Sequence, residues 1–110
     1  MKLTKEMRNW TKRWLDNLVL LIKFSKTIPT VPYSYKNGLY GNGLCFGVQE
    51  ARCLLDKAES TETWKVEIMK AIAHRKTILM EAVIDDQKVI SKAWIVGLKA
   101  VLNYVECVEL

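Results

Sequence analysis

The only histidine in the chain is the first place to look for acid–base chemistry. Three charged residues share one side of a predicted helix with His74, at spacings of three, four and seven: Glu67, Lys70 and Glu81. Glu67 or Lys70 could form a proton-transferring pair with the imidazole. However, charges at this spacing are typical of a solvent-exposed helix surface, and no nucleophile or oxyanion donor accompanies them. We therefore expect a plain surface here and no enzyme activity.

The three cysteines give a second set of reactive groups, at positions 45, 53 and 107. They form no C-x-x-C motif, and their odd number argues against a closed disulfide framework, so we expect reduced thiols and a cytoplasmic protein. Cys45 could be reactive near a helix start, although a buried, inert thiol is the more typical role. With one histidine and scattered thiols, the chain matches no zinc or iron pattern, and we expect no metal and no cofactor.

The stretch YSYKNGLYGNGLCFG (residues 33–47) contains four glycines and could present backbone N–H groups to a phosphate. It lacks the Gly-Lys-Ser/Thr ending of a phosphate loop and follows no clear strand. Asn37-Gly38 and Asn42-Gly43 are instead turn dipeptides. The sequence therefore predicts an irregular Tyr/Gly-rich loop over residues 33–43, with a short hairpin across residues 31–40 as an option.

Positive charge is concentrated at the start of the chain. The net charge is +5, and residues 1–36 alone hold eight Lys or Arg against two acidic residues. Such a distribution indicates an anionic partner. Single-stranded nucleic acid is one alternative, because tyrosines can stack on bases while cations neutralise phosphates. Against it, thirteen of the seventeen basic residues are lysine, whereas arginine is the residue of planar phosphate and base recognition.

A second hypothesis, which we prefer, is binding to another protein through an acidic or apolar surface. The chain has four Trp and four Tyr, and both residues are enriched where proteins meet. We expect a non-enzymatic binding module, such as an inhibitor, an adaptor or a small phage-type accessory regulator, and a homodimer is an option. The predicted partner-binding residues are Lys5, Arg8, Lys12, Tyr33, Tyr35, Lys36 and Tyr40.

One domain of 110 residues must position these side chains. Residues 3–27 predict a basic amphipathic helix whose inner face would be Leu3, Met7, Trp10, Trp14, Leu18 and Leu21. Residues 18–22 are apolar on all sides, so we expect them to lie between neighbouring elements. The prolines at positions 29 and 32 end this helix, and a second helix is expected from Gly43 or Leu44 to Ala58.

The remaining chain predicts either two helices or one. Ser60 or Thr61 can cap a helix that starts near Trp64, and the polar stretch DDQ (85–87) is the only break before residue 105. A single helix over residues 61–105 would require a dimer, because a monomer could not cover it. Two antiparallel helices are closer to normal helix lengths, so we predict an all-α four-helix bundle. No apolar run approaches the ~20 residues that a membrane span needs, and no targeting segment is evident.

Overall fold

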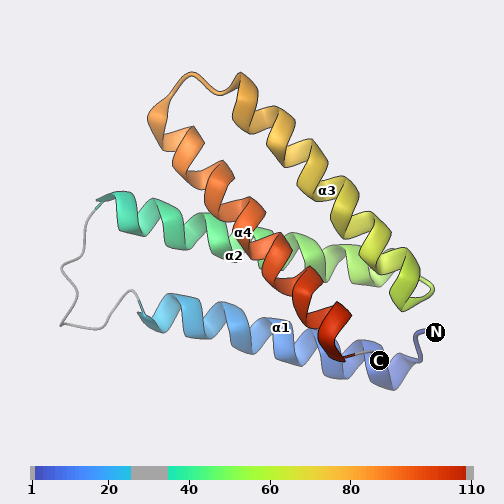
Figure 1. The fold of residues 1–110 in the computed structure, drawn as a ribbon. Helices are drawn as coiled ribbons and strands as arrows, with labels where there is room; N and C mark the ends of the chain where they lie inside the picture. Colours follow the sequence, from blue (N-terminus) through green and yellow to red (C-terminus); the bar gives the residue numbers. More distant parts are fainter. Residues whose placement is uncertain (1, 26–34, 109–110) are drawn as a thin grey trace.

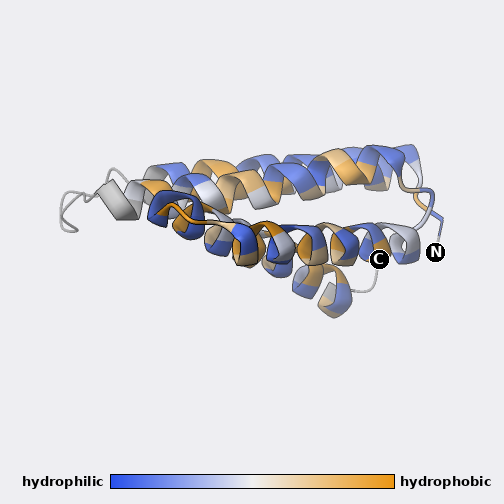
Figure 2. Cartoon of the chain, turned by 90° about the horizontal axis from the view of Figure 1, so that it is seen from above, coloured by the Kyte–Doolittle hydropathy of each residue, from blue (hydrophilic) through white to orange (hydrophobic). Residues whose placement is uncertain are grey.

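The computed structural model describes residues 2–25 and 35–108, and all helices within them belong to one bundle. The helices are α1 (Lys5–Ser25), α2 (Tyr35–Lys57), α3 (Thr61–Glu81) and α4 (Asp85–Val108). The predicted all-α four-helix bundle is confirmed, and the stretch from residue 61 to 105 consists of two antiparallel helices (Figure 1). The body is flat, with extents of 42 × 34 × 20 Å, and two layers of helices are visible from above (Figure 2).

Helix α4 crosses α2, and this crossing makes the most extensive contact between helices (Figure 1). Gly43 and Gly47 face α4 from successive turns of α2, and Gly97 faces them from α4. A Cβ atom on Gly43 would lie 2.5 Å from the carbonyl oxygen of Ile90, and one on Gly97 would lie 2.6 Å from that of Leu44. The two backbones therefore approach each other more closely than any larger residue would permit.

This crossing explains why the predicted Tyr/Gly-rich loop is wrong from Tyr35 onward, where the chain is already helical. The Asn-Gly pairs predicted turns, yet Gly43 and Gly47 are four residues apart and lie on one side of α2. Their missing side chains make room for α4, and tertiary packing offsets the helix propensity that glycine lacks. The optional hairpin is wrong over residues 35–40, which are helical, while Tyr33 and the rest of that hairpin lie outside the described residues.

Side-chain hydrogen bonds cap the starts of α1 and α3. Ser60 caps α3 as predicted: its side chain accepts from the backbone N–H of Thr63 at 3.1 Å, and the Thr63 hydroxyl accepts from the Ser60 N–H at 3.0 Å. Thr4 accepts from the Met7 N–H at 3.1 Å and caps α1. The break between α3 and α4 falls at residues 82–84, just before the acidic residues that were expected to form it. Asp85 and Asp86 instead occupy the first turn of α4, where their negative charges interact favourably with the helix dipole.

The predicted inner face of α1 is partly wrong. Trp10 and Leu21 are exposed, at 56% and 65%, while Thr11, Leu15 and Val19 are buried. Helix α1 packs along α2, and its Trp14 stacks on Tyr104 of α4 with ring centroids 3.7 Å apart. One neighbouring helix, α2, buries only a narrow strip of the α1 surface. The second half of α1 is accordingly not enclosed as expected.

Candidate protein-binding face

Two of the predicted basic residues on α1 bind α2. The Arg8 guanidinium donates to the carbonyl oxygen of Leu55, and the Lys12 ammonium forms an ion pair with Asp56. Arg52 pairs with Asp16 at 2.8 Å in the same interface. Arg8 and Lys12 therefore hold α1 against α2, and only Lys5 of the predicted stripe stays exposed without such a contact among the described residues.

The Lys12 ion pair has a measurable consequence for Asp56. The hydrogen bond from Lys12 lowers the pKa of this carboxyl below its ordinary value. A lowered folded-state pKa means that the pair stabilises the fold above the unfolded-state pKa and loses this contribution as the pH falls through the folded-state pKa. We expect Lys12→Ala to raise the Asp56 midpoint in a carboxyl NMR titration, while Lys5→Ala leaves it in place. An unchanged midpoint in Lys12→Ala would show that Lys12 is not the cause.

Of the predicted tyrosine positions, the structure describes the side chain of Tyr40 alone. Tyr40 is 41% exposed on α2. Tyr35 and Lys36 belong to the first turn of α2, and Tyr33 lies outside the described residues. Tyr40 therefore lies at the surface of α2. The binding role of these residues stays a prediction.

The groups that suggested chemistry are dispersed over the bundle. His74 is exposed, and Lys70 beside it pairs with Glu67 at 3.3 Å, which is the surface arrangement that its spacing predicted. Cys45 is buried, and the other two free cysteines are exposed. No three His, Cys, Asp or Glu side chains gather to hold a metal ion within residues 2–25 and 35–108.

A half-buried aromatic cluster links three helices. The indole N–H of Trp94 donates to Glu50 Oε1 at 2.8 Å, and the Arg75 guanidinium lies 3.6 Å from the centroid of the Trp94 ring. Phe46 contacts the same ring, with centroids 5.1 Å apart. The cluster joins α2, α3 and α4. It also fixes the antiparallel register of α3 and α4, since residue 75 is level with residue 94.

Helix α3 is apolar on two opposite sides. Trp64, Ile68 and Ile72 are buried in the bundle. On the outward side lies a second apolar row, the α3 stripe, whose members are spaced by three, four and seven residues: Val66, Met69, Ala73 and Met80. Val66 is 45% exposed, Met69 49% and Met80 86%. A helix that is apolar on more than one side is normally covered on each of them. Among the described residues, no other helix covers the outward side of α3.

The turn between α3 and α4 extends this apolar surface. Val83 and Ile84 are 86% and 59% exposed, directly after Met80. The turn stands apart from α1 and α2 (Figure 1). The α3 stripe and this turn together hold five of the eleven large apolar side chains that are exposed among the described residues.

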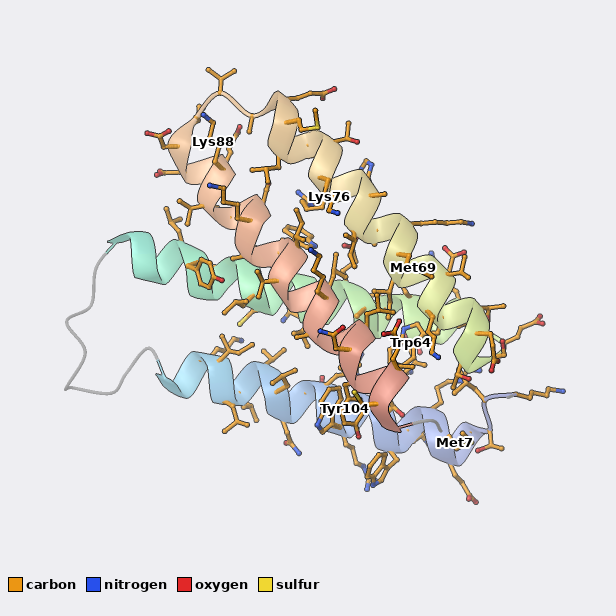
Figure 3. All side chains as sticks on the ribbon, in the orientation of Figure 1. Met7, Trp64, Met69, Lys76, Lys88 and Tyr104 are labelled. Carbon is orange, nitrogen blue, oxygen red and sulfur yellow. The ribbon has the colours of Figure 1, made fainter. Side chains whose placement is uncertain are left out.

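Five lysines, the lysine row, lie beside the α3 stripe: Lys65 and Lys76 on α3, and Lys88, Lys92 and Lys99 on α4. Those on α4 fall within about 40° of one another around the helix, because each residue advances by about 100°. They lie on the side opposite Gly97, which faces α2. Since Arg75 is level with Trp94, Lys76 is close to the level of Lys92, and Lys76 is seen between α3 and α4 (Figure 3).

The two lysines of α3 also face away from α2. Glu67, on the other border of the buried side of α3, lines an open depression with Leu54, Lys57 and Ala58 at the end of α2. Lys65 and Lys76 are on the opposite border, between the α3 stripe and α4. No carboxylate of the described residues lies within ion-pair distance of any of the five ammonium groups. The outer surface of the α3–α4 hairpin is therefore apolar and basic side by side.

Comparison with known proteins adds no further assignment. No family model, curated protein or solved structure matches this chain. None of the helices in the described residues is both long and apolar enough to cross a membrane.

Proposed function

We propose that this protein is a non-enzymatic binding module that acts by docking on another protein through the α3 stripe. The observation that carries the proposal is the second apolar side of α3, exposed opposite the core. Methionine-rich apolar surfaces adapt their shape to a partner, and an apolar row at heptad spacing is the surface that a partner helix packs against. Inhibition or adaptation of a partner's activity would follow from such docking.

The predicted site on α1 and the Tyr/Gly-rich stretch gives less support for the same function. Arg8 and Lys12 are engaged with α2, which leaves them unable to serve as free cations. Trp10 is exposed on α1, but polar Arg13 and Asn17 follow it on the same side before the next apolar residues. Leu20 and Leu21 are also exposed, within the last two turns of α1. We therefore place the docking surface on α3.

Replacing Met69 and Met80 with aspartate is expected to abolish capture of the natural partner from an extract of the source cells. Two charges in the centre of an apolar contact would have to be desolvated on binding. Because both side chains are exposed, the free energy of unfolding should change by no more than about 1 kcal/mol, or about 0.5 kcal/mol for each substitution. The measurement is quantitative mass spectrometry of proteins captured by the tagged chain, alongside a urea unfolding curve.

The matched control places the same two aspartates at exposed positions on other helices, as Asn17→Asp and Gln49→Asp. This control should retain the captured protein at the level of the unchanged chain. The proposal fails if the control and the α3 variant capture the same protein equally well. It fails equally if alanine at Tyr40 removes the partner while the α3 variant retains it.

A further inference from the structure

The lysine row identifies the kind of partner that fits the α3 stripe. We infer that the occupant is an amphipathic helix of another protein, with acidic residues flanking its apolar side. This inference rests on the function proposed above and names the chemistry of the partner. Five ammonium groups on the outer surface of the hairpin have no carboxylate partner among the described residues. A bound helix on the α3 stripe would place one of its flanks along this row.

Position along the helices supports a helical occupant. Lys65 and Lys76 lie eleven residues apart, which is about three turns, and they border the α3 stripe on the side toward α4. Lys92 and Lys99 continue the row on α4. Carboxylates on a partner helix at spacings of three, four or seven residues would follow the same line. The apolar contact would supply affinity, and the charges would supply orientation and selectivity.

Acidic residues occur only toward the ends of this surface. Glu62 and Glu106 lie near the amino end of α3, and Asp85 lies at the hairpin turn. Between these ends, the outward side of the described hairpin carries lysines, apolar residues and the uncharged Asn103. The complementary partner would therefore be acidic along its middle.

A second copy of this chain is a poor occupant. A two-fold symmetric contact through the α3 stripe would bring the same patch of both copies together, and hence lysine against lysine. Juxtaposed like charges at an interface are unfavourable. An acidic partner helix removes this repulsion and neutralises the row.

Nucleic acid and membrane surfaces fit this face less well. The described outer face of the hairpin presents methionine, valine and alanine beside the lysines, with no aromatic ring for stacking on bases. Its cations are all lysine, which lacks the planar, bidentate geometry of arginine. Surface-bound helices usually insert Trp or Phe at the lipid boundary, and the α3 stripe has neither.

The test uses two synthetic peptides of 21 residues, the length of α3, with leucine at the heptad core positions of both. The flanking positions are glutamate in one and lysine in the other. Fluorescence anisotropy with the full chain should give tighter binding of the acidic peptide. In the variant Lys76→Glu, Lys92→Glu, the acidic peptide should bind about tenfold more weakly, and the basic peptide should gain affinity.

The control variant Arg13→Glu, Lys23→Glu has the same net charge but changes exposed positions on α1. It should bind both peptides as the unchanged chain does. Equal effects of the two double variants, or equal binding of both peptides, would overturn the inference. Tighter binding of a thirty-nucleotide oligo(dT) or of anionic phosphatidylserine vesicles than of the acidic peptide would overturn it as well.

The aspartate variant of Met69 and Met80 separates the two proposals. If it binds every peptide as well as the unchanged chain, docking on the α3 stripe is wrong. If it loses peptide binding while charge reversal has no effect, the docking surface stands and the acidic partner is wrong. Loss of acidic-peptide binding in both variants supports both proposals.

Discussion

Replacing Gly47 with alanine is expected to lower the free energy of unfolding, although helix propensity alone predicts the opposite. Alanine in a helix is favoured over glycine by about 1 kcal/mol. At Gly47, however, an added Cβ would lie 2.9 Å from the backbone nitrogen of Leu98 and closer still to the carbonyl oxygen of Trp94. A side chain could change its rotamer to relieve such a contact, but backbone atoms cannot. Helices α2 and α4 must therefore move apart. Overpacking of this kind costs about 1–3 kcal/mol, and valine should cost more.

Urea unfolding followed by circular dichroism measures this effect. The control is Gln49→Ala, on an exposed position of the same helix, where the change in stability should be within about 0.5 kcal/mol. A double variant of Gly47 and Gly97 should show strong non-additivity, since the two residues contact each other across the crossing. If Gly47→Ala stabilises the protein, the close approach of α2 and α4 is wrong.

Replacing Trp64 with alanine should cause the largest loss among the aromatic residues. Trp64 is fully buried, and its indole N–H donates to the Ala51 carbonyl oxygen at 2.9 Å. This side chain joins α3 to α2 where the two helices meet at the end of the bundle (Figure 3). Truncation of such a residue leaves a large cavity and costs about 3–5 kcal/mol, a major part of the 5–15 kcal/mol that stabilises a typical domain.

The chain supplies a matched control in Trp10, which is 56% exposed on α1. Trp10→Ala removes the same atoms and should cost far less than Trp64→Ala in the same denaturation experiment. Trp64→Phe should fall between them, because it retains most of the volume and loses the hydrogen bond. Similar losses from Trp10→Ala and Trp64→Ala would mean that the assigned burial of the two tryptophans is wrong.

The sequence predicted the helices better than the faces by which they pack. The spacing of apolar residues and the cap at Ser60 were sufficient to predict four helices, because both are local signals in the sequence. The glycines at positions 43 and 47 were assigned to turns, because Asn-Gly pairs are strong turn signals. Their four-residue spacing, continued by Ala51 and matched by Ala93 and Gly97, was the available sign of a close helix crossing.

The candidate site was missed for a related reason. No docking residue was predicted on α3, which has two apolar sides, only one of which the bundle covers. The spacing of Met69, Ala73 and Met80 was visible in the sequence, but which side meets α4 depends on tertiary packing. Lysines were predicted to bind a partner only at the start of the chain, where the net positive charge is greatest. The row on α3 and α4 comes together only when the hairpin forms.

The most direct test of the docking surface is methyl NMR of the methionines while the acidic peptide is added. Met69 and Met80 lie on the α3 stripe, and Met7 is half-buried on α1 as an internal reference. Our account predicts that the methyl signals of Met69 and Met80 shift with peptide concentration and that the Met7 signal stays in place. Shifts at Met7 alone, or no shift at Met69 and Met80 when the peptide is in excess, would contradict it.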